Sequence, residues 1–264
     1  MSCSIVVVDC NSSSWGQLIE KWGSDKLLKK VIGSLIILAN SHLPLSAGNR
    51  MLLVAAGSCL QNKVLFSSEF ISKSVSVASE IDANIRKAIE MSARSSESFT
   101  HTNYSSSFAL AVCHYNRFKR ENPKADGRII VLNMSPESHA EQSKLMNLFL
   151  GAQQQNLCIH VASLSLTNPM LRQASDVTGG VHREIQTVDD LPDFFTRYCL
   201  GNSKEAQDAF AIKNFEKIDY QASCFCHNRP VSLGFVCSVC LAVHCQYIPI
   251  CVACGTAFKV ARKK

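Results

Sequence analysis

Short apolar runs alternate along the first 200 residues with longer segments in which apolar residues recur at helical spacing. The short runs predict strands at residues 5–8, 51–56, 64–66, 128–132, 157–164 and 181–185. The longer segments predict helices at residues 26–40, 80–93, 105–120, 135–156, 169–177 and 188–200. Apolar strands that alternate with helices form a parallel sheet with helices on both faces. The pattern therefore predicts an α/β fold, a Rossmann-like three-layer sandwich with a mostly parallel sheet.

The first predicted strand ends in a group of short polar side chains. Residues 4–15 are SIVVVDCNSSSW, so the apolar run is followed directly by Asp9, Asn11 and Ser13. In such sheets ligands bind beyond the carboxyl ends of the strands, and Asn133 follows the strand at 128–132 at the same edge. These oxygen-bearing side chains either hold a metal ion or an anion, or only shape a turn and cap a helix.

Composition narrows the class of protein. The chain has 264 residues, of which 47% are hydrophobic and 18% are charged, so it can bury a core and does not resemble a disordered chain. No apolar run approaches the roughly 20 residues that span a bilayer, and the N-terminus lacks the features of a secretory signal peptide. The common glycine-rich nucleotide-binding motifs are absent from the sequence. We expect an intracellular protein that makes no membrane contact.

Cysteines concentrate near the C-terminus. Seven of the 13 cysteines lie between residues 224 and 254, and in an intracellular chain such crowding favours metal binding over disulfides. The pairs Cys237-x2-Cys240 and Cys251-x2-Cys254 are two metal knuckles separated by ten residues. Four thiolates close a tetrahedral shell around one Zn²⁺ and leave no open position for catalysis. We predict a structural zinc site.

The remaining cysteines and histidines of this segment leave two alternatives open. Cys224, Cys226 and Cys245, together with one histidine, predict a second zinc site that is interleaved with the first, as in RING domains. Of the two nearby histidines we assign His244 to this set rather than His227. Alternatively, these residues are spare thiols and imidazoles beside a single zinc ribbon.

Changes in composition mark the predicted domain boundaries. The sandwich covers residues 1–200, the polar and weakly periodic residues 201–222 form a linker, and residues 223–258 form the cysteine-rich zinc module. The formal net charge is +6, and part of it lies in a basic tail at residues 259–264. Such a tail is either solvated or makes a weak, salt-sensitive contact with phosphate. We expect contact with DNA to be weak or indirect.

The first strand and its polar end resemble the opening of a von Willebrand factor type A domain. That family has an Asp-x-Ser-x-Ser motif that supplies metal ligands, and the matching residues here are Asp9, Asn11 and Ser13. The segment FTHTNYSSSFALAV resembles the family's threonine loop, with Thr102 as the match. Asn133 stands where the family has a second carboxylate, and Mg²⁺ prefers carboxylate ligands. The resemblance implies a von Willebrand factor A sandwich with a degenerate metal-adhesion site that binds no metal tightly.

The cysteine-rich segment extends the resemblance to a narrower family. Its sequence, SCFCHNRPVSLGFVCSVCLAVHCQYIPICVACGTAFK, is similar to the C-terminal motif of the smaller von Willebrand-A subunits of the transcription and DNA-repair factor TFIIH. The match also includes NSHL at 40–43 and TGG at 178–180. It implies a nuclear, non-catalytic core subunit that acts in RNA polymerase II initiation and nucleotide excision repair. The implied partners are other TFIIH core subunits, above all a sister subunit with its own type A domain and zinc-binding C-terminus.

Two other functions fit the zinc module taken alone. A RING-like ubiquitin ligase requires two cross-braced zinc ions, but the ligand spacing is irregular for that class. A nucleic-acid-binding zinc protein requires a groove lined with cations and stacking aromatic residues, and the module has few basic residues before residue 259. No nucleophile with a partner base is indicated, so no enzymatic activity is predicted.

Overall fold

The computed structural model describes most of the sandwich and most of the cysteine-rich module. The described residues are 1–23, 26–57, 60, 63–70, 76–94, 102–135, 141–164, 168–200, 224–227, 229 and 231–258. The predicted linker at 201–222 and the predicted basic tail at 259–264 lie outside these ranges, so both stay predictions. Among the described residues, no helix combines the length and apolar character needed to cross a membrane.

The sandwich is built on a six-stranded sheet in the order β3-β2-β1-β4-β5-β6. The strands are β1 (Ser2–Asp9), β2 (Arg50–Ala56), β3 (Val64–Ser67), β4 (Asp126–Asn133), β5 (Cys158–Ser163) and β6 (His182–Glu184). All neighbouring pairs are parallel except β2 and β3, which are antiparallel. The predicted mostly parallel sheet is confirmed, with one antiparallel strand at its edge.

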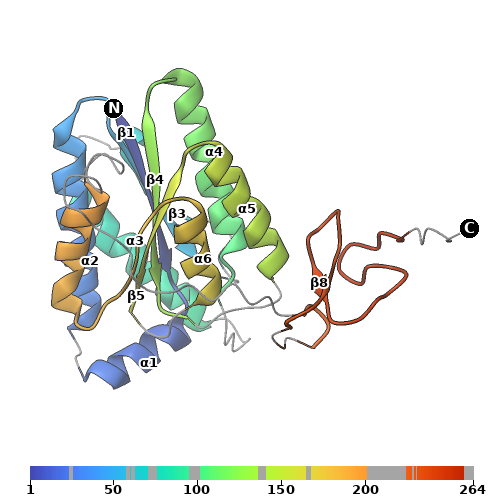
Figure 1. The fold of residues 1–264 in the computed structure, drawn as a ribbon. Helices are drawn as coiled ribbons and strands as arrows, with labels where there is room; N and C mark the ends of the chain where they lie inside the picture. Colours follow the sequence, from blue (N-terminus) through green and yellow to red (C-terminus); the bar gives the residue numbers. More distant parts are fainter. Residues whose placement is uncertain are drawn as a thin grey trace, which may run out of the picture.

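Helices cover both faces of the sheet. They are α1 (Ser12–Trp22), α2 (Leu27–His42), α3 (Val77–Arg94), α4 (Ser105–Glu121), α5 (Gln142–Gln154), α6 (Pro169–Val177) and α7 (Leu191–Phe194). In Figure 1, α2 and α3 lie on one side of the sheet, and α4, α5 and α6 lie on the other. Short 3₁₀ turns occupy Leu43–Leu45, Ser68–Phe70 and Val188–Asp190. The predicted three-layer α/β fold is therefore confirmed, although the sequence pattern had not separated α1 from the first loop.

The continuous apolar run of β1 follows from its central position in the sheet. Val6 and Val8 face the core beneath α1, α2 and α3, whereas Ile5 and Val7 face the core beneath α4, α5 and α6. Because side chains alternate between the two faces of a strand, a strand covered on both faces must be apolar at every position. Asp9, the last residue of β1, is also fully buried.

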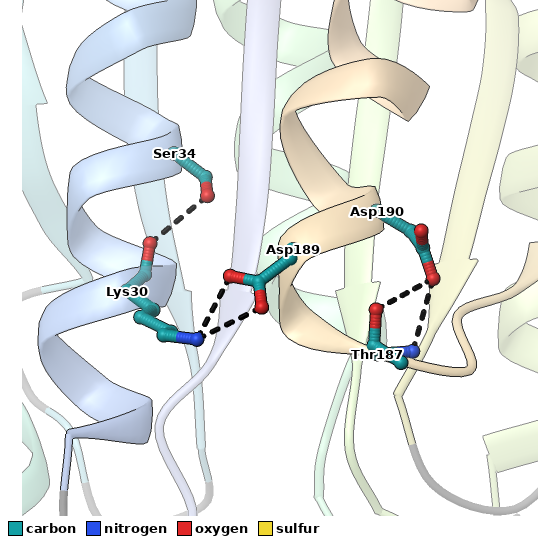
Figure 2. Close-up of polar contacts among 5 residues, drawn as sticks. All are labelled: Lys30, Ser34, Thr187, Asp189 and Asp190. Carbon is teal, nitrogen blue, oxygen red and sulfur yellow. Dashed lines mark hydrogen bonds and ion pairs between the residues drawn. The ribbon is translucent and has the colours of Figure 1, made fainter.

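The end of the sandwich differs from the single helix predicted at 188–200. The structure has the 3₁₀ turn Val188–Asp190, then α7, then a π-helical turn at Phe195–Cys199. Asp190 accepts hydrogen bonds from the backbone N–H and the hydroxyl of Thr187, which fixes the start of the 3₁₀ turn (Figure 2). Lys30 Nζ of α2 lies 2.8 Å from Asp189 Oδ1 (Figure 2). These polar contacts cap and anchor the N-terminal end of the segment, which is helical throughout residues 188–199 but changes from 3₁₀ to α to π geometry.

Gly180 allows the turn after α6 to approach β5. A Cβ atom at Gly180 would lie 1.9 Å from the carbonyl oxygen of Ile159, which belongs to the strand backbone. We expect Gly180→Ala to lower the free energy of unfolding by roughly 1–3 kcal/mol, because the strand cannot move without disturbing its ladder. Urea unfolding followed by tryptophan fluorescence measures the change.

The matched control for this prediction is Gly151→Ala in α5. A Cβ atom at Gly151 meets no other atom within 4 Å. Since alanine has the higher helix propensity, this variant should gain up to about 1 kcal/mol. A Gly180→Ala variant with wild-type stability would contradict the close approach.

Candidate functional site

A buried polar cluster lies at the carboxyl edge of the sheet. We call it the Asp9 cluster, and its members are Asp9, Ser14, Thr102, Tyr104, Asn133 and Ser135. Asp9 Oδ1 accepts hydrogen bonds from Asn11 N at 3.0 Å and from Thr102 Oγ1 at 2.7 Å. Asp9 Oδ2 accepts from Tyr104 OH at 3.1 Å and from Ser135 Oγ at 2.5 Å. Both carboxylate oxygens are thus occupied by donors from the protein itself.

The turn after β1 is shaped by its own side chains. Asn11 is the N-cap of α1, and its side chain accepts a hydrogen bond from Ser13 N at 3.1 Å. Trp15 Nε1 donates to the carbonyl oxygen of Asp9 at 2.9 Å. Ser13 is exposed, whereas Ser14 is buried and its Oγ lies 2.6 Å from Ser135 Oγ. The first turn of α1 thus directs Ser14 into the cluster, and the predicted grouping of Ser13 with Asp9 stays a prediction.

Asn133 joins the cluster through a residue that the sequence pattern had not indicated. Tyr104 OH lies 2.9 Å from Asn133 Oδ1 and also contacts Asp9. Ser135, predicted as the cap of a helix starting at 135, lies inside the cluster instead, and α5 begins at Gln142. Residues 136–140 lie outside the described part of the chain. The sequence does not single out Tyr104, because a tyrosine next to an apolar helix resembles a packing residue.

Burial controls the electrostatics of the Asp9 cluster. Desolvation raises the pKa of Asp9, and the hydrogen bonds from Ser135, Asn11, Thr102 and Tyr104 oppose this shift. Burial also raises the pKa of the Tyr104 hydroxyl, with a further rise from the neighbouring Asp9. Tyr104 therefore keeps its proton and acts as a donor. The arrangement ties β1, β4 and the segment before α4 together through one carboxylate.

The two predicted knuckles of the cysteine-rich module converge on one point. The sulfur atoms of Cys237, Cys240, Cys251 and Cys254 all lie within 4.8 Å of one another. The distances Cys237 Sγ–Cys254 Sγ and Cys240 Sγ–Cys251 Sγ are both 3.7 Å. A tetrahedral zinc site with Zn–S bonds of about 2.3 Å has sulfur–sulfur edges of about 3.8 Å. The donor set and its dimensions fit a zinc ion.

The two knuckles have the same backbone geometry. Leu241 N donates to Cys237 O at 2.9 Å, and Gly255 N donates to Cys251 O at 2.8 Å. Leu241 and Gly255 are both left-handed, with φ values of 61° and 74°. The first knuckle joins β7 (Phe235–Val236) to β8 (Val243–His244) as a hairpin. Two copies of one turn therefore present two pairs of sulfur atoms to each other.

His244 does not belong to the second group of ligands, so its predicted assignment is wrong. Its ring is buried, and Nε2 lies 3.5 Å from Cys251 Sγ of the first knuckle pair. The group formed by Cys224, Cys226 and Cys245 contains His227 instead. His244, the last residue of β8, directs its ring toward the first knuckle pair, whereas Cys245, the next residue, joins the second group.

Within each cysteine group the pKa of at least one thiol is lowered and that of another is raised. The pKa of Cys240 is raised to about 12, first by burial, and that of Cys245 to about 11, first by a hydrogen bond with Cys226. The pKa of Cys254 is lowered to about 6, first by the hydroxyl of Thr256, whose Oγ1 lies 3.1 Å from Cys254 Sγ. The pKa of Cys224 is also lowered to about 6, first by a backbone hydrogen bond from Arg229. Thiolates are the form in which cysteine binds metals.

The surface of the cysteine-rich module is unusually apolar. We define its exposed apolar set as Leu233, Phe235, Val236, Val239, Tyr247, Ile250 and Val252. Leu233 is 85% exposed and Val252 is 65% exposed. A cavity of about 150 Å³ is lined by Phe235, Val236, His244, Tyr247, Ile248 and Phe258. Phe235, Val236 and Tyr247 of this set lie together around the cavity, and exposed apolar groups that lie together are typical of a surface that contacts another protein.

The fold and the sites together define a von Willebrand factor A-like sandwich followed by a cysteine-rich module that fits zinc. A family model described as Transcription factor Tfb4 matches residues 1–255, and the chain belongs to this family. The solved structure titled TFIIH p34 N-terminal domain superposes with a TM-score of 0.60 and 22% identity, covering 73% of this chain and 95% of that one. The likeness to this structure supports the fold of the sandwich.

Curated relatives extend the comparison beyond the sandwich. General transcription factor IIH subunit 3 of Dictyostelium discoideum is 34% identical over 60% of this chain, and the match spans 43% of its own length. The general transcription and DNA repair factor IIH subunit tfb4 of Schizosaccharomyces pombe is 25% identical over 98% of this chain and 89% of its own length. These matches give the ubiquitin-ligase and nucleic-acid-binding alternatives no support.

Proposed function

We propose that this chain is a non-catalytic, structural subunit of a TFIIH core complex in the nucleus. It acts in transcription initiation by RNA polymerase II and in nucleotide excision repair by holding other subunits of the complex. The observation that supports this role most strongly is the match of residues 1–255 to the Tfb4 family. The name of the Schizosaccharomyces pombe relative includes both transcription and DNA repair. Contact with DNA through the basic tail is weak or indirect.

The proposed zinc ligands of the first site are Cys237, Cys240, Cys251 and Cys254. A zinc ion held by four thiolates has no open coordination position, so it supplies folding energy rather than catalysis. Cys237 and Cys251 are buried beside Ala242 in a very small apolar core. Such a core is too small to stabilise the module without a metal ion.

The Asp9 cluster supports an anchoring role rather than metal-dependent adhesion. Asp9 is the only carboxylate among its members, and both oxygens already accept hydrogen bonds. A divalent cation such as Mg²⁺ binds directly to carboxylate oxygens, and here it would have to displace the protein donors that occupy both oxygens of Asp9. We propose that the degenerate site holds no tightly bound metal and fixes the loops of the sandwich.

The sister subunit with its own type A domain and zinc-binding C-terminus is the proposed main partner, and the exposed apolar set is its proposed contact surface. Leu233→Asp should weaken the complex with the purified sister subunit by roughly tenfold or more, since it places a charge in an apolar interface. The dissociation constant measures the effect, and unchanged zinc content checks the fold.

A matched control lies on the sandwich. Leu45 is 64% exposed in the 3₁₀ turn Leu43–Leu45, so Leu45→Asp makes the same change outside the module. This variant should bind the sister subunit like the wild type. If Leu45→Asp weakened the complex while Leu233→Asp did not, the proposed contact surface would be wrong.

A further inference from the structure

A second group of metal-binding side chains lies in the cysteine-rich module, separate from the two knuckles. It consists of Cys224, Cys226, His227 and Cys245, whose ligand atoms all lie within 4.8 Å of one another. We propose that these four residues bind a second zinc ion, with His227 Nδ1 as the only nitrogen ligand. This site goes beyond the proposed function, which requires only the four-thiolate site.

The distances within the group match a tetrahedral shell of three sulfur atoms and one nitrogen atom. Cys226 Sγ lies 3.4 Å from Cys245 Sγ, and His227 Nδ1 lies 3.3 Å from Cys245 Sγ and 3.9 Å from Cys224 Sγ. With Zn–S near 2.3 Å and Zn–N near 2.0 Å, the tetrahedral edges are about 3.8 Å and about 3.5 Å. Soft thiolates with one imidazole select zinc over magnesium or calcium.

Backbone hydrogen bonds hold the group in place. Phe225 N donates to Val243 O at 2.7 Å, which fastens the turn at 224–227 to β8. Cys224 N donates to Arg229 O at 2.9 Å and closes that turn. Cys245 follows β8 directly, so the same strand brings the fourth ligand to the turn. Backbone hydrogen bonds therefore already position the four ligand residues that would bind the second zinc ion.

The order of ligands along the chain gives the second ion a structural role. The turn at 224–227 precedes the first knuckle, and Cys245 lies between the two knuckles. The ligands of the two sites therefore alternate along the chain, and the two ions together cross-link the module. Because His244 is adjacent to Cys245 and lies against Cys251, it connects the two sites without binding the second ion.

Zinc content of the purified full chain tests the proposal. The wild type should hold two zinc ions per chain, and His227→Ala should hold one. His244→Ala is the matched control, since it removes the neighbouring imidazole of the same module, and it should keep two. After replacement of zinc by cobalt, His227→Ala should retain only the absorption bands of a four-thiolate site.

Every other result of the zinc analysis either supports or contradicts the second site. The second site would be overturned if His227→Ala still held two zinc ions. It would also be overturned if the wild type held only one zinc ion and His227→Ala kept it. One ion in the wild type that His227→Ala removes would support the second site and contradict the proposed four-thiolate site. Loss of both ions in His227→Ala is resolved by His227→Cys, which should restore two ions with a shifted cobalt spectrum. A His227→Cys variant that holds fewer than two ions would overturn the proposal.

Discussion

A Cys251→Ser variant should lose the zinc of the four-thiolate site, and the cysteine-rich module should unfold with it. Cys251 is buried, receives a contact from His244 and forms a small core with Cys237 and Ala242. A structural zinc ion contributes on the order of 10 kcal/mol to such modules, far more than this core can supply. Metal analysis should show the loss of at least one zinc ion per chain. Hydrogen exchange should show that the amides of residues 231–258 lose their protection.

The control for this prediction is a cysteine outside both groups. Cys113 lies exposed on α4, so Cys113→Ser removes a thiol without touching the module. It should keep the zinc content and the exchange pattern of the wild type. A Cys251→Ser chain that retained its zinc and its protected amides would show that the two knuckles do not share an ion.

Most of the sandwich could be predicted because its elements are determined by local patterns. The apolar run of β1 and the helical stripe of α2 each indicate one element without reference to the rest of the chain. The direction of β3 could not be predicted in this way. A short apolar run shows that a strand is buried, but not whether it runs parallel or antiparallel to its neighbour.

The same distinction between local patterns and long-range packing applies to the candidate sites. The two knuckles were predictable because each pair of cysteines is fixed by one turn of four residues. The choice between His227 and His244 depended on which way β8 presents its side chains, which the order of residues alone does not determine. Similarly, Ser135 reaches Asp9 across 126 residues of sequence, so only the packing of β4 beside β1 reveals the contact.

Asp9→Asn should destabilise the sandwich by roughly 2–4 kcal/mol, because it removes an accepting oxygen from two buried donors and each buried donor without an acceptor costs about 1–3 kcal/mol. The amide keeps the shape of the side chain but replaces one accepting oxygen with a donor. In place of Oδ1 that donor faces Asn11 N and the Thr102 hydroxyl. In place of Oδ2 it faces the hydroxyls of Tyr104 and Ser135, so in either position it meets groups that donate to Asp9. Both tryptophans, Trp15 and Trp22, lie in α1, so their fluorescence during urea unfolding reports on this part of the sandwich.

An exposed carboxylate provides the matched control for Asp9→Asn. The side chain of Asp189 is 74% exposed and pairs with Lys30 across the surface (Figure 2). Exposed ion pairs contribute little, so Asp189→Asn should change stability by no more than about 1 kcal/mol. Equal effects of the two substitutions would contradict an anchoring role for Asp9.

The difference in stability between the wild type and Asp9→Asn should change with pH in one direction. Burial raises the pKa of Asp9 above its ordinary value of 3.8, so the folded chain binds this proton more tightly than the unfolded chain does. The contribution of Asp9 to stability is therefore fully present below the unfolded pKa and is lost as pH rises through the folded pKa. Asparagine does not titrate, so the stability difference between the wild type and Asp9→Asn should narrow as pH rises above about 4, the pKa of an aspartate in the unfolded chain. A difference that widened over this range would show that the four hydrogen bonds outweigh burial, and that the folded site prefers the charged carboxylate.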